Sequence, residues 1–169
     1  MRRTLLESML SRPLTEAPPT PDDAALAELA GKLDATARRR LGRSLSIREV
    51  DAGSCNGCEL EVHALGNAFY DLERLGLRFV ASPRHADVLT VTGPVTQNMR
   101  EALQRTYEAT PDPKWVVALG TCAADGGLFA ASPAVVGGVS HVIPVDLHIR
   151  GCPPSPHDIL KGLIALLTG

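Results

Sequence analysis

From residue 45 onward, short apolar runs alternate with longer stretches in which apolar residues recur at helical spacing. Five apolar runs of strand length predict β-strands at Leu45–Val50, Leu77–Ala81, Val88–Val91, Trp115–Leu119 and Val145–Ile149. The remaining stretches predict helices at Cys58–Leu75, Gln97–Ala109 and Pro156–Leu167. Strands that alternate with helices form βαβ units, so the pattern predicts the α/β class, with a mainly parallel sheet flanked by helices.

The C-terminal helix has the clearest start signal. Ser155 supplies an N-cap, Pro156 stands at the first helical position, and Asp158 completes a pattern like a capping box. One apolar face follows, made of Ile159, Leu160, Leu163, Ile164 and Leu167. We expect this face to cover the sheet.

Residues 1–44 differ from the rest and predict a helical N-terminal extension, separate from an α/β domain at residues 45–169. Leu5, Leu6, Met9 and Leu10 recur at helical spacing, prolines break the pattern, and Thr20–Asp23 carries the start signals of a second helix. The extension could pack on its own domain, dock on a partner or lie at a membrane surface. Composition alone favours the first.

The chain has 169 residues, 44% of them apolar and 21% charged, which is typical of one soluble globular domain. Its formal charge of -2 provides too little positive charge for phosphate-backbone binding, so nucleic acid is not an expected partner. The longest apolar stretches, such as Gly162–Leu167, fall short of the roughly 18 to 20 residues that cross a bilayer. The N-terminus lacks the pattern of a signal peptide, so we expect a cytoplasmic chain.

Four cysteines carry the candidate chemistry, because a reducing compartment favours metal ligation or redox chemistry over disulfides. Cys55 and Cys58 follow the first predicted strand, Cys122 follows the fourth, and Cys152 follows the fifth. Because parallel strands end at one edge of the sheet, three separate segments can bring four thiolates together there. Inert thiols would instead be expected within the apolar faces of strands and helices.

Two kinds of metal centre accept four thiolates, namely zinc and an iron–sulfur cluster. Structural zinc usually draws on two close pairs, whereas here only Cys55 and Cys58 form a close pair. Single ligands from distant loops suit a bulky cubane that is anchored on several sides. Glycines beside the cysteines let the backbone approach such a cluster and offer N–H groups to its sulfurs, while Pro153 and Pro154 stiffen the last loop.

Several segments together resemble a known family. They are Ser54-Cys55-Asn56-Gly57-Cys58-Glu59, Ser82–Asp87, Thr92–Thr96, Gly120-Thr121-Cys122 and Gly151–Pro156. These segments look like the small subunit of energy-converting [NiFe] hydrogenases and formate hydrogenlyase, which is homologous to the 20 kDa cluster-bearing subunit of respiratory NADH:quinone oxidoreductase. The resemblance spans roughly Leu45 to Leu167 and leaves residues 1–44 outside.

The resemblance implies a flavodoxin-like domain that holds one [4Fe-4S] cluster on Cys55, Cys58, Cys122 and Cys152. It also implies a subunit of a multi-subunit oxidoreductase that is not catalytic alone. Such a subunit passes single electrons between a ferredoxin-like iron-sulfur subunit and the active site of a large hydrogenase-like subunit. Membrane-arm subunits would hold the complex at the cell membrane, with this chain cytoplasmic and peripheral on the inner face.

Two alternatives to the hydrogenase-type complex stay open. In the respiratory branch of the family the first two cysteine ligands are adjacent, whereas here two residues separate Cys55 from Cys58, as in the hydrogenase branch. This spacing disfavours a quinone-reducing subunit without excluding it. The other alternative is a non-redox zinc module that uses the same four thiolates and serves assembly.

Two glutamates follow Cys58 on the predicted helix. Glu61 lies about one helical turn beyond Cys58, so its carboxylate is expected beside the cluster or on a surface that faces a partner. By resemblance to an acidic position in the family, Glu61 is a candidate proton relay, and the alternative is a solvated charge. Glu59 is expected to be a first-turn carboxylate that the helix dipole favours.

Overall fold

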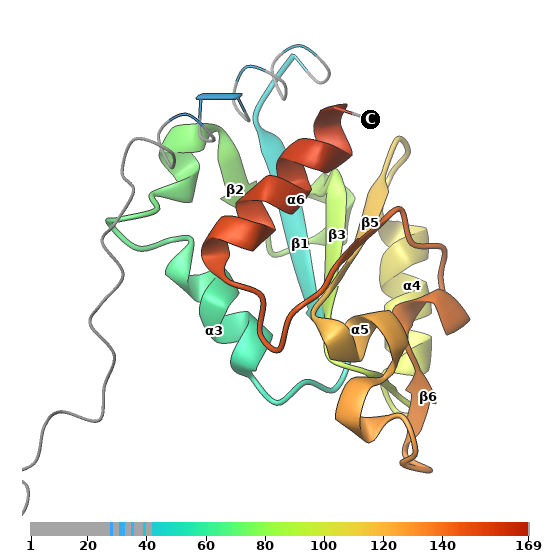
Figure 1. Ribbon diagram of the computed structural model, residues 1–169. Helices are drawn as coiled ribbons and strands as arrows, with labels where there is room; N and C mark the ends of the chain where they lie inside the picture. Colours follow the sequence, from blue (N-terminus) through green and yellow to red (C-terminus); the bar gives the residue numbers. More distant parts are fainter. Residues whose placement is uncertain (1–27, 29–30, 33–34, 36–38, 40–41, 169) are drawn as a thin grey trace, which may run out of the picture.

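The computed structural model describes residues 28, 31–32, 35, 39 and 42–168 of the chain (Figure 1). A parallel sheet of five strands, in the order β2-β1-β3-β5-β7, forms its centre. These strands are β1 (Leu45–Asp51), β2 (Leu77–Phe79), β3 (Val88–Thr92), β5 (Trp115–Leu119) and β7 (Leu147–Ile149). A separate antiparallel pair consists of β4 (Val95–Thr96) and β6 (Val135–Gly137).

Helices cover both faces of the parallel sheet. Between residues 42 and 168, the α-helices are α3 (Gly57–Ala64), α4 (Arg100–Ala109), α5 (Thr121–Asp125) and α6 (Pro156–Thr168). Short 3-10 helices are η1 (Leu72–Leu75), η2 (Pro83–His85), η3 (Gly127–Phe129) and η4 (Val139–His141). In Figure 1, α3 and α6 lie in front of the sheet, and α4 and α5 lie toward its other side.

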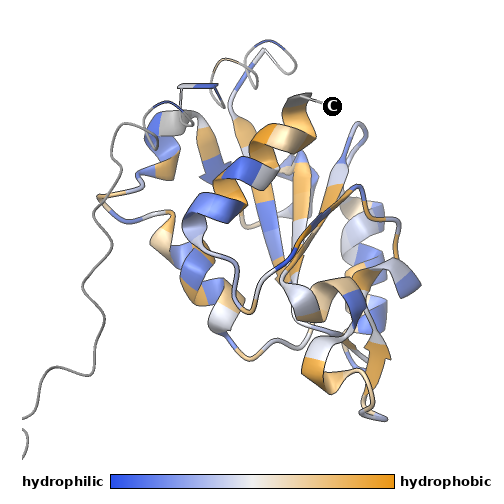
Figure 2. Ribbon diagram, in the orientation of Figure 1, coloured by the Kyte–Doolittle hydropathy of each residue, from blue (hydrophilic) through white to orange (hydrophobic). Residues whose placement is uncertain are grey.

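The central strand β3 shows why the sheet needs cover on both faces. All five of its residues are buried, and their side chains alternate between two cores. Val88 belongs to the core with α6 residues such as Leu160, whereas Leu89 belongs to the core with Leu103 of α4. The central strands are correspondingly apolar in Figure 2.

The predicted α/β class with a mainly parallel sheet is confirmed. When the β4–β6 pair is set aside, the strand order is that of flavodoxin-like folds, so the expected subtype is confirmed as well. Each predicted strand is present, although β2 and β7 are shorter than predicted. The sequence pattern did not reveal α5 or the β4–β6 pair, because these elements have at most five residues each.

The prediction of one continuous helix over Cys58–Leu75 was wrong. α3 ends at Ala64, and a turn separates it from η1. The Asn67 side chain stabilises this turn, because its Oδ1 accepts the backbone N–H groups of Phe69 at 2.8 Å and Tyr70 at 3.0 Å. Asp71 then has a φ of 43°, which is incompatible with a right-handed helix.

The predicted cap of α6 is confirmed. The Ser155 Oγ accepts the Asp158 N–H at 3.3 Å and donates to the Asp158 carboxylate at 2.6 Å. The predicted N-terminal extension, residues 1–44, lies largely outside the described residues, so the proposed domain boundary stays a prediction. Within the described part of the chain, no helix is both long enough and apolar enough to cross a membrane.

Candidate metal centre

All four cysteines line one cavity of about 90 Å³ at the carboxyl edge of the sheet. Cys55 lies in the loop after β1, Cys58 in the first turn of α3, Cys122 in α5 and Cys152 in the loop after β7. The cavity is completed by Ser54, Gly57, Gly93, Thr121, Gly151 and Pro153. The segments that carry these residues follow the carboxyl ends of β1, β3, β5 and β7, as the parallel topology predicts.

Hydrogen bonds fix the loops that carry the cysteines. The Asp51 carboxylate accepts the backbone N–H groups of Gly53 at 2.8 Å and Ser54 at 2.7 Å, which shapes the loop before Cys55. Thr121 donates to the Gly151 carbonyl from its backbone N–H at 2.8 Å and from its hydroxyl at 3.1 Å. The Cys122 segment is therefore tied directly to the Cys152 loop.

An ion pair adds a second link between these two segments. The guanidinium of Arg150 lies 3.1 Å from the carboxylate of Asp125 at the end of α5. Arg150 is two residues before Cys152. Both side chains are more than half exposed, so the pair contributes little stability and serves chiefly to align the two segments.

At two positions, a cysteine sulfur lies so close to the backbone that only glycine fits. A Cβ at Gly120, which has a φ of 93°, would lie 2.6 Å from the Sγ of Cys58. A Cβ at Gly127 would lie 2.8 Å from the Sγ of Cys122. The sulfur atoms thus occupy space that a Cβ would fill, so these two positions require glycine.

The four thiols influence one another electrostatically. The pKa of Cys58 is raised to about 12, chiefly by burial and in part by the negative charges of Glu59 and of the other three cysteines. Burial also raises the pKa of Cys122, as do Cys152 and Cys55, against a hydrogen bond from the Leu128 backbone N–H. Four thiolates can therefore coexist in this cavity only with a compensating positive charge, which bound iron or zinc supplies.

The four cysteines line a cavity that they share. In the described part of the chain, no group of three or more His, Cys, Asp and Glu residues has the geometry for one metal ion. A single zinc ion holds all of its ligands at about 2.0 to 2.3 Å. In a cubane each cysteine binds a different iron, so the sulfurs lie further apart. The donor set, four thiols around one cavity, therefore fits the ligands that such a cluster requires.

Glu59 is buried to an extent that the sequence did not indicate. Only 7% of the residue is exposed, and neither carboxylate oxygen has a hydrogen-bond partner among the described residues. Its position in the first turn of α3 agrees with the expected helix-dipole effect, but burial without a partner demands a further explanation. Glu61 is half-buried and does not line the cysteine cavity, so its relay role stays a prediction.

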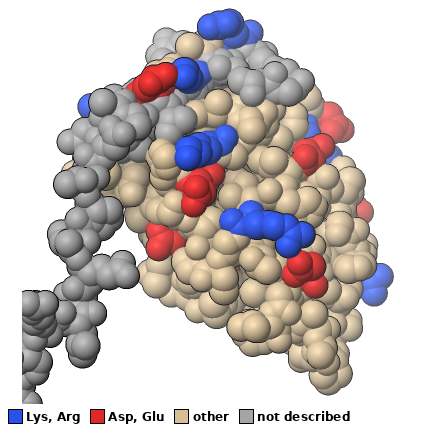
Figure 3. Space-filling view, viewed as in Figure 1, with Lys and Arg blue, Asp and Glu red and all other residues tan. Residues whose placement is uncertain are grey.

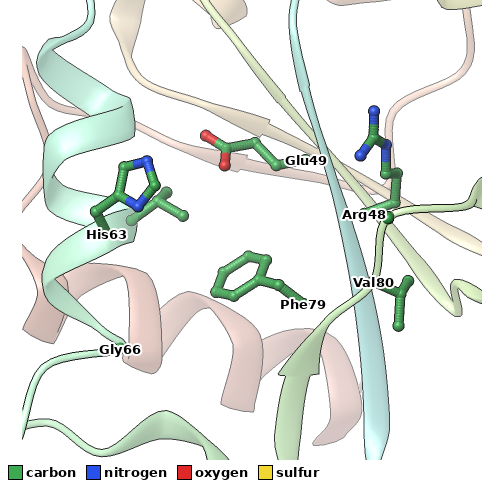
Figure 4. A pocket seen from close by; sticks show the side chains of 8 residues that line it. Arg48, Glu49, His63, Gly66, Phe79 and Val80 are labelled. Carbon is green, nitrogen blue, oxygen red and sulfur yellow. The ribbon is translucent and has the colours of Figure 1, made fainter.

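A second cavity of about 360 Å³ lies between β1, the end of β2 and α3. It is lined by Arg48, Glu49, Val62, His63, Gly66, Phe79, Val80 and Ala81. In Figure 4 the Glu49 carboxylate and the His63 ring face the same space, with Phe79 below them. Sequence analysis missed this site, although two adjacent charged residues within β1, Arg48 and Glu49, were its visible signal.

Glu49 has an unusual electrostatic environment. Its pKa is raised to about 7, chiefly by burial and then by the charge of Glu59; the charge of Asp51 adds to the rise, whereas His63 and Arg48 oppose it. Its Oε1 is buried and has no hydrogen-bond partner in the part of the chain that the structure describes. The cavity therefore contains an acceptor that the described residues leave unsatisfied.

The fold and the cysteine cavity define a class of protein: flavodoxin-like α/β domains that present four thiols at the carboxyl edge of a parallel sheet. Within that class, the chain belongs to the NADH ubiquinone oxidoreductase, 20 Kd subunit family, which it matches over residues 55–166. The family expected from the sequence motifs is thereby confirmed.

The chain is similar to subunits of membrane-associated oxidoreductases. It is 47% identical over 127 residues to the Probable membrane-bound hydrogenase subunit mbhJ of Pyrococcus furiosus, covering 75% of this chain and 76% of that protein. It is 41% identical over 140 residues to formate hydrogenlyase subunit 7 of Escherichia coli, covering 83% of this chain and 55% of that protein. Among solved structures, it resembles a chain of the membrane-bound sulfane sulfur reductase, an archaeal respiratory membrane complex, with a TM-score of 0.67, 36% identity and coverage of 81% and 74%.

Proposed function

We propose that this chain is the electron-transfer subunit of a membrane-associated, hydrogenase-type complex. It carries one [4Fe-4S] cluster on Cys55, Cys58, Cys122 and Cys152. The observation that carries the proposal is the convergence of these four cysteines, from three separate segments, on one cavity. The identity to a hydrogenase subunit and a formate hydrogenlyase subunit supports it.

The residues of this chain bind the cluster, position it and shield it. A bound cluster supplies one-electron transfer. Four cysteine ligands satisfy its iron atoms and leave no coordination position for a substrate, so the reaction with substrate takes place in another subunit. Gly120 and Gly127 give the ligand sulfurs room, and the Leu128 N–H donates to the Cys122 sulfur. Such hydrogen bonds tune the potential of a cluster.

The surface beside the cysteine cavity is suited to a protein partner. Leu60 of α3, which is 60% exposed, and Leu128 of η3, which is 88% exposed, follow Cys58 and Cys122 closely in the chain. Charged side chains are sparse around β6, at the bottom of Figure 3. Cys55 and Cys152 are themselves exposed. We infer that the large hydrogenase-like subunit covers this end and shields the cluster from water.

The remaining partners follow from the same assignment. A ferredoxin-like iron-sulfur subunit exchanges electrons with this cluster, and membrane-arm subunits hold the complex at the membrane. The chain is then cytoplasmic and peripheral on the inner face of the membrane. Quinone reduction is less well supported, because two residues separate Cys55 from Cys58 and the relatives above include hydrogenase-type subunits.

The proposal is tested by replacing one cysteine in the complex. Wild type, Cys122→Ala and the control Ser44→Ala, an exposed residue at the opposite edge of the sheet, are purified anaerobically with their partner subunits. Wild type and control should contain iron and sulfide, and should show brown visible absorption that bleaches on reduction. Cys122→Ala should lose this absorption and electron delivery to the large subunit while the other redox centres stay intact. Wild-type turnover by Cys122→Ala, or a colourless wild type that contains zinc, would contradict the proposal.

A further inference from the structure

The lining of the second cavity includes a carboxylate oxygen that has no hydrogen-bond partner among the described residues. This atom is Glu49 Oε1, which is buried without a hydrogen-bond partner in the part of the chain that the structure describes. Leaving buried acceptors of this kind unpaired costs about 1 to 3 kcal/mol per group, so native proteins normally provide a partner.

The cations nearest to Glu49 do not fulfil this role. Arg48 is the neighbouring residue of the same strand, and successive side chains of a strand point to opposite faces. In Figure 4 the Arg48 guanidinium accordingly points away from the Glu49 carboxylate. His63 faces Glu49, but Oε1 still lacks a hydrogen bond. The lining therefore includes one carboxylate group with an unsatisfied oxygen, and the cavity has room for a donor from outside.

We propose that this cavity receives a basic side chain, arginine or lysine, from a neighbouring subunit of the complex, which pairs with Glu49. This inference rests on the proposed function, because the partner is a subunit of that complex. A volume of about 360 Å³ accommodates a long basic side chain. Phe79 lines the cavity and remains 40% exposed, so its ring offers a surface for the aliphatic stem or for a cation–π contact.

Charge complementarity and exposed apolar surface together favour a macromolecular partner. Phe69, which follows the cavity residue Gly66 in the chain, is 47% exposed, and α3 also leads from this cavity to the cysteine cavity. A single partner subunit can therefore contact both cavities. A free small cation could pair with the Glu49 carboxylate but would leave the exposed aromatic rings uncovered.

The test compares two substitutions at Glu49 with a matched control. Glu49→Gln removes the charge at nearly constant shape, Glu49→Asp keeps it, and Glu108→Gln alters an exposed glutamate of α4 on the other side of the sheet. Each complex is purified and washed at rising ionic strength, and the fraction of this subunit that remains bound is measured together with its iron content. We expect association to weaken at least about tenfold for Glu49→Gln, less for Glu49→Asp, and not at all for Glu108→Gln.

A second measurement uses the full chain without its partners. Because Glu49 then has no external cation, Glu49→Gln should stabilise the isolated chain above neutral pH while it weakens the complex. If Glu49 had a merely structural role, Glu49→Gln would not stabilise the isolated chain and weaken the complex at the same time. Methylguanidinium serves as the small-cation probe and should raise the melting temperature of wild type but not of Glu49→Gln.

Each outcome has a defined meaning. Association of Glu49→Gln equal to wild type overturns the inference, including the case in which methylguanidinium binds, since the occupant is then a free cation. Destabilisation of the isolated chain by Glu49→Gln also overturns it, because a basic residue of the chain itself then fills the cavity. These failures leave the iron content normal, whereas absence of iron from the wild-type complex refutes the proposed function instead.

Discussion

Substitution of Gly120 by alanine tests directly whether the cysteine cavity is built around its sulfur atoms. The new Cβ would lie 2.6 Å from the Cys58 Sγ, well inside the 3.4 Å at which ordinary contact begins. Overpacking of this kind typically costs about 1 to 3 kcal/mol. The φ of 93° at Gly120 adds about 1 to 3 kcal/mol for a residue with a side chain. We therefore expect the free energy of unfolding to fall by about 2 to 6 kcal/mol.

Because Cys58 is one of the proposed ligands, Gly120→Ala should also reduce metal binding. The backbone around Gly120 is held by its N–H bond to the Ile149 carbonyl at 2.8 Å, so Cys58 has to move instead. We expect the iron content and the visible absorption of the anaerobically reconstituted chain to fall well below those of wild type. Gly31→Ala is the control, since nothing lies within 4 Å of its Cβ position.

A double-mutant cycle separates the sulfur clash from the backbone strain. In a Cys58→Ala background the clash is absent, so Gly120→Ala should cost only the part that arises from φ. Urea unfolding of the four chains gives the coupling free energy between the two positions. Equal costs of Gly120→Ala in both backgrounds, or wild-type iron content in the single variant, would refute the contact between Gly120 and the Cys58 sulfur.

Three further substitutions test the core and its charges. Leu89→Ala removes a fully buried side chain from β3 and should lower the free energy of unfolding by about 2 to 5 kcal/mol in urea. Arg43→Ala leaves buried Asp87 without the guanidinium that binds it at 2.9 and 2.5 Å. The free energy of unfolding in urea should fall by about 1 to 3 kcal/mol, and adding salt to wild type should not cause the same loss. The pKa of Glu49 is raised from 4.5 to about 7, so the folded chain binds the proton more tightly than the unfolded chain. Wild type should therefore lose stability as the pH rises between these values, by about 1 to 2 kcal/mol after discounting for solvent, and Glu49→Gln should not. A pH-independent difference between these two chains in thermal melts would contradict that assignment.

Local sequence patterns were sufficient for elements that depend on near neighbours. The apolar run at Val88–Val91 predicted the central strand, and Ser155 with Asp158 predicted the cap of α6. The spacing of the cysteines after predicted strands also placed all four at one edge of the sheet, because parallel strands must end together. The same reasoning failed for Cys58–Leu75, where a side-chain hydrogen bond of Asn67 ends the helical pattern.

Only the tertiary structure determines which polar groups are buried and which of them lack hydrogen-bond partners. The sequence shows Glu49 and Glu59 as ordinary charged residues of a strand and of a first helical turn. Only the folded chain buries Oε1 of Glu49, a residue that lines a cavity, and both carboxylate oxygens of Glu59. Similarly, the sequence placed glycines near the cysteines, but only the fold brings Gly120 against the sulfur of Cys58, 62 residues away. Periodicity records which face of an element is apolar, whereas burial and charge balance depend on elements that are distant in the chain.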